Sequence, residues 1–189
     1  MTHSSGDRRR RHLLLGEWAC LGVLYEGPTH GFAIASALRP GGELGRVWSL
    51  SRALTYRSLD QLAERGLVRS VGEEPGIAGG NRTVLAATRA GRAELRRWLA
   101  TPVAHLRDLR SELLLKLVVA ERCGLDVGEM LERQRAIVAD LAAAVAPDDA
   151  TDDTTADSTD DTTDVVVLWR RETSSAALRF LDQLLIPAR

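Results

Sequence analysis

Residues 51–57 include side chains that can bind a nucleic acid through hydrogen bonds and charge attraction. Ser51 carries a hydroxyl and Tyr56 a phenol. Arg52 and Arg57 carry guanidinium groups, which donate hydrogen bonds to phosphates and can bind O6 and N7 of one guanine together. In a helix these side chains would occupy the first two turns, the part of a helix-turn-helix that meets base edges and flanking phosphates.

The spacing of apolar residues predicts that this segment is a helix over residues 51–65. Ser51 is a typical N-cap residue, and Leu59, Leu62 and Gly66 follow along one helix face. Gly66 can also end the helix. Polar residues occupy the opposite, solvated face: Arg57, Asp60, Gln61 and Glu64.

A β-hairpin is predicted directly after this helix. Residues 67–71 read as a short strand, a loop rich in glycine follows, and residues 83–87 read as the return strand. Asn81 and Arg82 lie at the loop tip, where contact with the DNA backbone or minor groove is expected rather than sequence readout. A helix followed by a hairpin is typical of a winged helix. The predicted DNA contacts are Ser49, Ser51, Arg52, Tyr56, Arg57, Asn81 and Arg82.

These residues also allow plainer interpretations. Tyr56 is equally consistent with an aromatic side chain at the boundary of the core, and Arg57 with a solvated charge. An alternative function is therefore a winged-helix protein-interaction module that does not bind DNA.

The charge distribution favours a phosphate partner for the first half of the chain. Residues 1–100 contain 15 arginines against 9 acidic residues, whereas residues 101–189 contain 10 basic against 17 acidic residues. A basic half is the electrostatic footprint of a DNA-binding domain. Arg8 to Arg11 add a basic run that is either an arm reaching a phosphate or minor groove, or a frayed terminus.

No motif supports an enzyme, a cofactor or a metal site. The chain lacks GxSxG, P-loop and GxGxxG patterns, and an acidic tract at residues 147–164 lacks the glycine and the final glutamate of a calcium loop. Cys20 and Cys123 read as buried thiols in a reducing compartment rather than as a redox pair. No histidine has ligand spacing: His3, His12, His30 and His105.

The N-terminus lacks the apolar core of a signal peptide, and no apolar stretch has the length of a membrane span. We therefore expect a cytoplasmic protein without a membrane partner. The other predicted helices span residues 12–25, a segment from about residue 29, and residues 89–100, 106–122, 127–145 and 165–186.

The acidic tract at residues 147–164 holds eight Asp, six Thr and no hydrophobic residue larger than alanine, so it is predicted to be disordered. It acts either as an inert tether or as a competitor of phosphates for the arginines. The helix after it carries apolar residues, such as Trp169 and Phe180, that must pack on this chain or on a partner.

The order of several motifs over about the first 120 residues resembles the PadR family of bacterial transcription regulators. The matching residues are Leu15-Gly16 and Leu21 to Leu24; Gly27-Pro28-Thr29-His30-Gly31-Phe32-Ala33-Ile34, similar to GP-x-HGY-x-I; Trp48, Tyr56, Leu59, Leu62 and Gly66-Leu67; Thr88-Arg89-Ala90-Gly91-Arg92 with Trp98-Leu99 and Pro102; and Glu112-Leu113-Leu114-Leu115-Lys116. Two departures are the order Leu54-Thr55, which removes an expected phosphate contact at Leu54, and the missing tyrosine before Thr88.

The resemblance implies a mainly α fold with a small β-hairpin wing. Its expected domains are a winged helix-turn-helix at residues 12–102 and a helical dimerisation domain at residues 103–189 that contains the acidic insertion. It further implies a homodimeric repressor on an inverted-repeat operator in double-stranded DNA, and leaves open a ligand response to a small aromatic effector. Trp48 and Trp98 match framework positions, so core packing is expected for both, whereas the role of Trp169 stays open.

Overall fold

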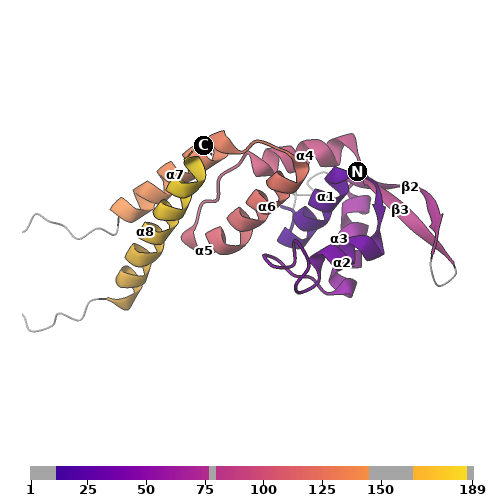
Figure 1. The fold of residues 1–189 in the computed structure, drawn as a ribbon, viewed down its shortest axis with the longest axis horizontal. Coiled ribbons are helices and arrows are strands. Elements are labelled where there is room, and N and C mark those ends of the chain that lie inside the picture. Colours follow the sequence, from indigo (N-terminus) through magenta and orange to yellow (C-terminus); the bar gives the residue numbers. More distant parts are fainter. Residues whose placement is uncertain (1–11, 77–79, 145–163, 187–189) are drawn as a thin grey trace, which may run out of the picture. The chain divides into compact units, whose positions relative to one another are not determined.

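The computed structural model describes residues 12–76, 80–144 and 164–186 (Figure 1). The chain divides into two compact units, Met1–Arg96 and Arg97–Arg189, which are treated separately below. The basic run Arg8 to Arg11 and residues 147–163 of the acidic tract lie outside the described residues. The predicted domain boundary after Pro102 stays a prediction.

The first unit is a set of helices with a small antiparallel sheet, and this confirms the predicted fold class. Its elements in chain order are α1 (Leu15–Glu26), β1 (Thr29–His30), α2 (Gly31–Leu38), α3 (Arg52–Glu64), β2 (Val68–Pro75), β3 (Asn81–Ala87) and α4 (Arg89–Leu99), the last of which runs across the boundary between the units. Leu21, Leu24, Ile34, Leu38 and Leu62 are fully buried, because α1 and α2 both pack on α3.

The sheet has three strands in the order β1-β3-β2, one more than the sequence predicts. Thr29 and His30 form β1 opposite Leu85 and Val84 of β3. Two residues carry no alternating pattern, so this strand arises from its partner rather than from its own sequence. The hairpin of β2 and β3 is the wing, and its register shifts between Ser70 and Gly72.

The start of α4 is tied to the start of the wing by one hydroxyl group. Thr88 Oγ1 donates to the carbonyl oxygen of Gly66 at 2.8 Å and accepts from the Gly91 backbone N–H at 3.1 Å. A Cβ atom at Gly91 would clash with the carbonyl oxygen of Leu67. Arg92 then donates to the backbone carbonyl of Tyr25 in α1 at 2.9 Å. The Thr88-x-x-Gly91-Arg92 pattern thus joins α4 to both α1 and the wing.

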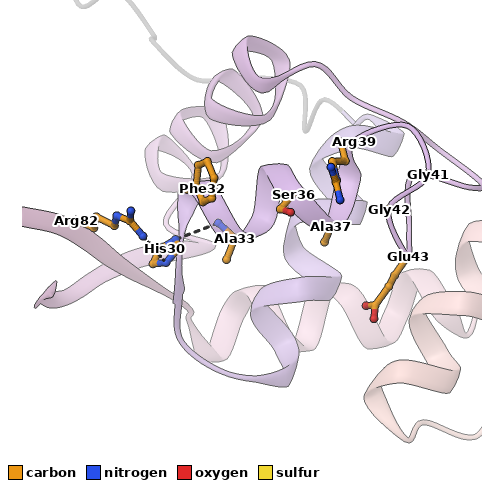
Figure 2. Close-up of a pocket in the computed structure, with 10 residues that line it drawn as sticks. All are labelled: His30, Phe32, Ala33, Ser36, Ala37, Arg39, Gly41, Gly42, Glu43 and Arg82. Atoms are coloured by element: carbon orange, nitrogen blue, oxygen red, sulfur yellow. Dashed lines mark hydrogen bonds between the residues drawn. The ribbon is translucent and has the colours of Figure 1, made fainter. Parts of the chain in front are cut away.

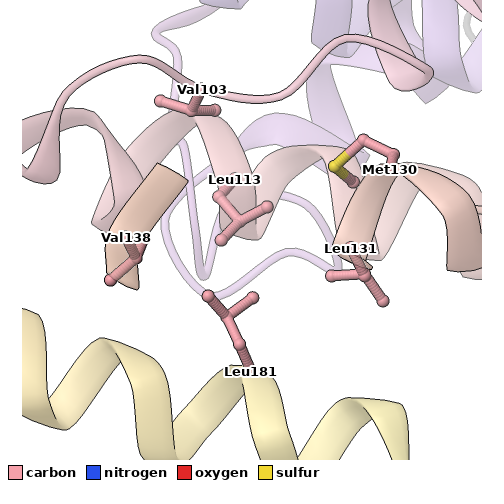
Figure 3. Close-up of a cluster of buried hydrophobic side chains, with 6 residues drawn as sticks. All are labelled: Val103, Leu113, Met130, Leu131, Val138 and Leu181. Atoms are coloured by element: carbon pink, nitrogen blue, oxygen red, sulfur yellow. The ribbon is translucent and has the colours of Figure 1, made fainter. Parts of the chain in front are cut away.

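The second unit contains α5 (Leu106–Asp108), η1 (Leu109–Leu113), α6 (Leu114–Cys123), α7 (Gly128–Ala143) and α8 (Val165–Leu185). The predicted helix over residues 106–122 is present, but η1 is a π-helical turn within it. A cluster of six buried side chains forms the core (Figure 3): Val103, Leu113, Met130, Leu131, Val138 and Leu181.

Helices α7 and α8 lie side by side and run antiparallel (Figure 1). Arg135 in α7 pairs with Asp182 near the end of α8, with 2.5 Å between Nε and Oδ1. This register places the last residue of α7 opposite Ser174, so the first two turns of α8 extend past the end of α7. Asp164, which the sequence analysis assigns to the acidic tract, is the N-cap of α8 and accepts from the Val166 N–H at 2.8 Å.

Candidate nucleic-acid interface

The N-terminal two turns of α3 form an exposed, basic surface. Ser51 caps the helix, and its Oγ accepts from the Leu54 N–H at 3.3 Å. Arg52 and Arg57 are both exposed, and the Arg57 guanidinium makes no hydrogen bond, ion pair or ring contact with any residue that the structure describes. Ser49 is exposed just before the helix. The role of these residues in DNA recognition stays a prediction.

The exchange of residues at positions 54 and 55 has a visible consequence. Thr55 is fully buried, and its hydroxyl donates to the carbonyl oxygen of Ser51 at 3.0 Å. Leu54 is 48% exposed and has no polar group to offer a phosphate. The hydroxyl is therefore hydrogen-bonded within the helix and is unavailable for a ligand.

Tyr56 lies at the boundary of the core and also reaches the surface. Its ring packs against the N-terminus of α2, because a Cβ at Gly31 would lie 2.8 Å from the Tyr56 Cε1 atom. The side chain is nonetheless 38% exposed. Gly31 is the residue that lets this ring approach α2.

Phe32 is an exposed aromatic residue beside the predicted site, and the sequence does not predict its position there. It lies in the first turn of α2, is exposed, and faces arginines from two other elements. The guanidinium of Arg52 lies 5.7 Å from the ring centroid and that of Arg82, in β3, lies 5.5 Å from it. In the sequence, only its place in the Gly27 to Ile34 motif marked Phe32 as a residue of interest. That motif does not indicate that Arg52 and Arg82 lie beside the ring.

His30 is the N-cap of α2, and this explains a histidine that has no ligand spacing. Its Nδ1 atom accepts from the Ala33 N–H at 3.0 Å, which places the proton of the neutral ring on Nε2. Nε2 lies 3.3 Å from Oε1 of Glu74 in β2 and 3.4 Å from Nη1 of Arg82. In this tautomer the Nε2–H can donate to Glu74, so the imidazole connects α2 to β2 of the wing.

The two predicted wing residues begin β3; the Asn81 side chain bonds within the wing, whereas that of Arg82 contacts Phe32 and His30. Asn81 donates from Nδ2 to Oε2 of Glu73 at 2.8 Å, and Arg82 stands opposite Glu74 in the register. Arg82 is only partly exposed. The wing therefore carries two carboxylates that the sequence alone did not single out, Glu73 and Glu74, and they balance the charges of Arg69 and Arg82.

An open cleft of about 580 Å³ runs along α2 beside this cluster (Figure 2). It joins guanidinium groups of Arg39 and Arg82 to the hydroxyl of Ser36, with the carboxylate of Glu43 at one end. Such a set can receive a phosphate at its basic part. The lining residues are His30, Phe32, Ala33, Ser36, Ala37, Arg39, Gly41, Gly42, Glu43 and Arg82.

Two titratable groups lie away from this surface. Burial, together with the charge of Glu17, raises the pKa of the Cys20 thiol to about 12. In the second unit, burial lowers the pKa of Lys116, whose Nζ lies 2.9 Å from Glu112 Oε1. Within the described segments, no three His, Cys, Asp or Glu side chains are placed to hold a metal ion. None of the described helices is long and apolar enough to cross a membrane.

Comparison with known proteins identifies one family. Residues 20–97 match the model of the "Transcriptional regulator PadR-like family". No curated protein matches the chain. The similar solved structures include Bacillus subtilis PadR in complex with operator DNA, at 21% identity and a TM-score of 0.44, covering 89% of this chain and 97% of that one.

Two further solved structures are similar to a comparable degree. Bacillus subtilis PadR in complex with p-coumaric acid is 21% identical with a TM-score of 0.43, and the match covers 91% of this chain and 97% of that one. The protein smu.1604c from Streptococcus mutans is 16% identical with a TM-score of 0.43, covering 92% of this chain and all of that one, 100%.

Proposed function

Residues 20–97 belong to the PadR-like family of transcriptional regulators, and from that premise we propose that this chain is a repressor that binds an inverted-repeat operator as a homodimer. The family assigns a transcriptional regulator with a DNA-binding winged helix. The repressor, the homodimer and the individual DNA contacts are our proposal.

The observation that carries the proposal is the exposed start of α3. A capped helix presents Arg52 and Arg57 in its first two turns, on a half of the chain with an excess of arginine. An arginine in this position can read a guanine in the major groove, while the neighbouring hydroxyls and the wing contact phosphates. Arg82, beside Phe32 and His30, supports a backbone contact from the wing.

The homodimer is proposed from the second unit. Val165, Val166 and Trp169 are exposed at the end of α8 that extends past α7, and a lone surface helix does not keep such residues in water without a partner. A dimer would also present two recognition helices about one turn of DNA apart, roughly 34 Å, and so match an inverted repeat.

Footprinting on the DNA that flanks the protein's own gene tests the proposal. We expect protection of an inverted repeat with half-sites about 10 base pairs apart, and an affinity that falls steeply with salt. Binding that shows no sequence preference would contradict the operator, and no binding at low salt would contradict the function. A repressor would lower transcription from that promoter in a purified transcription assay, whereas unchanged or increased transcription would contradict repression.

One observation favours a second function, a winged-helix module that binds a protein. Glu73 and Glu74 place two carboxylates on the wing, and Leu54 is an exposed apolar side chain on the recognition helix. Footprinting separates the two functions, since the second predicts no protected DNA. A ligand response to a small aromatic molecule stays a prediction, which screening of aromatic acids by thermal shift would test.

A further inference from the structure

Phe32 stands out in the first unit because it is a large apolar side chain left 51% exposed beside a buried core. Ile34 and Leu38, on the same helix, are fully buried. The position of Phe32 is therefore not explained by core packing. Its ring lies where three elements meet, namely α2, the N-terminus of α3 and the start of β3.

The ring is bordered by cationic groups from both of the other elements. Arg52 of α3 places its guanidinium carbon 5.7 Å from the Phe32 centroid, and Arg82 of β3 places its own 5.5 Å from it. Both distances lie within the range of a cation–π attraction. His30 adds a tilted ring contact at 6.3 Å between centroids, so Phe32 is held from the side of the wing as well.

An arginine on a protein surface normally samples many rotamers, and a ligand must then select one of them. A ring that attracts the guanidinium restricts these rotamers before the ligand arrives and so reduces the entropy that binding must remove. Arg57, in the next turn of α3, has no such contact among the described residues. The two arginines of α3 therefore differ: a ring restrains Arg52, whereas Arg57 is not restrained in this way.

We propose that Phe32 is a positioning residue for DNA recognition, whose ring orients Arg52 of the recognition helix and Arg82 of the wing toward the same DNA. The inference rests on the proposed function, because it assumes that the first unit binds DNA through α3 and the wing. Phe32 acts through the two arginines, so helix and wing bind together rather than independently.

The chemistry of the ring decides which substitution is informative. Leucine keeps an apolar side chain at this exposed position but has no π face, whereas tyrosine keeps the face. Phe32→Leu should therefore weaken operator binding by about 5- to 30-fold, the sum expected of two exposed cation–π contacts. Phe32→Tyr keeps both the π face and nearly the same shape, so its affinity should stay within about twofold of the parent.

Double-mutant cycles on the full-length protein test the coupling, with fluorescence anisotropy on the footprinted operator as the measurement. Phe32→Leu should cost less in an Arg52→Ala or Arg82→Ala background than in the parent, because one of the two partners of the ring is already gone. In the Arg57→Ala background it should cost the same as in the parent. Equal losses in all three backgrounds would overturn the inference.

A second measurement, on the free protein, separates this inference from the proposed function. In NMR spectra the Nε–H signals of Arg52 and Arg82 should each lose the ring-current contribution of Phe32 in Phe32→Leu, while the Arg57 signal stays unchanged. The Tyr56 ring also lies 5.7 Å from the Arg52 guanidinium carbon, and the His30 ring lies beside Arg82, so both signals should move without losing their whole shift. Unchanged signals for Arg52 and Arg82 would overturn the inference even if the protein binds its operator. If the parent protein shows these shifts but binds no DNA, the result would contradict the proposed function and, with it, the role of Phe32 in DNA recognition.

Discussion

The Cys20 thiol lies in α1 with none of its surface exposed, and this burial makes it a weaker acid. Burial first, and then the charge of Glu17, raise the pKa from 9.0 to about 12. The thiolate is the reactive form of cysteine, so this thiol is unreactive near neutral pH. A buried, inert thiol agrees with the interpretation of Cys20 as a small hydrophobic residue.

Cys20 should make the protein less stable at alkaline pH. Above pH 9 the unfolded thiol loses its proton while the folded thiol keeps it until about pH 12, so the folded state binds more protons and stability falls with pH. The expected loss at pH 10 relative to pH 7 is about 1.4 kcal/mol. Urea unfolding under reducing conditions gives the free energy of unfolding of the parent and of Cys20→Ala. The loss is the change, from pH 7 to pH 10, in the difference between these two free energies.

Lys116 contributes with the opposite sign in the same range, because its folded pKa is lowered by burial. Unfolding then takes up a proton between the folded pKa and 10.5, so stability rises with pH there. Both proteins in the comparison retain Lys116, and its contribution cancels in the difference. A difference between parent and Cys20→Ala that stays constant from pH 7 to pH 10 would contradict the prediction for Cys20.

Arg52 and Arg57 are the residues on which sequence readout should depend. Replacing either with alanine is expected to cost about 1–3 kcal/mol of operator binding and to relax specificity at one symmetric pair of base positions. Anisotropy titrations against the operator and single-base variants measure both effects. Arg110→Ala removes an exposed arginine from the second unit and serves as the control. Mutants at positions 52 and 57 that bind as tightly as the parent would refute the assignment.

At the scale of elements, the junction of wing and α4 depends on local hydrogen bonds and one close approach. Thr88 caps α4 toward Gly91 and bonds to the carbonyl oxygens of Gly66 and Leu67 at 2.8 and 3.2 Å. The small Gly91 lets α4 pass next to the Leu67 backbone. The wing is therefore oriented by α4 as well as by its own sheet.

Thr88→Val should destabilise the protein by about 1–2 kcal/mol, because it keeps the shape of the side chain but removes a helix cap and its donated bonds. Thr88→Ser retains the hydroxyl and should lose much less. Thermal unfolding of the three proteins measures the difference. Equal stability of the valine and threonine proteins would show that the hydroxyl contributes nothing to this junction.

At the scale of the molecule, the exposed end of α8 is the surface on which assembly should depend. Val165 is 73% exposed and Trp169 is 70% exposed, so charged residues can replace them without disturbing a core. The buried part of the helix, around Ser174 and Leu181, packs within the same unit. Assembly and folding can therefore be separated by substitution on one helix.

Trp169→Glu is expected to shift a dimer toward monomer in sedimentation experiments at micromolar concentration, because a charge in a desolvated apolar interface is unfavourable. Gln183→Glu adds the same charge at another exposed position of α8 and should leave the dimer intact. Circular dichroism should be unchanged in both. A parent protein that is already monomeric at this concentration would disprove the dimer.

The acidic tract is the second feature that belongs to the whole molecule. Exchanging residues 148–163 for a neutral linker of equal length keeps Asp164, which caps α8. We expect unchanged affinity for non-specific duplex at low salt, as for an inert tether. Tighter binding that fades near 0.1 M salt, where the Debye length is about 10 Å, would instead show that the aspartates compete with phosphates.

Features that depend on neighbours in the chain could be predicted from the sequence. The limits of α3 were predicted to within one residue, because Ser51 caps it and Leu59 and Leu62 repeat at helical spacing. The hairpin, the last helix and the exposure of Arg52 and Arg57 follow from the same local rules. All of these signals act within one or two turns of backbone.

Features that depend on distant partners required the tertiary structure. Phe32 meets Arg82 across 50 positions of sequence, and His30 connects α2 to Glu74 in the wing. The strand β1 exists because β3 lies beside it. Periodicity shows which side of an element is apolar but not which partner lies against it, since that depends on how helices and strands pack. The sequence by itself determined the main helices, the hairpin and the basic surface of α3, and the packing of α2, α3 and the wing decided which side chains meet there.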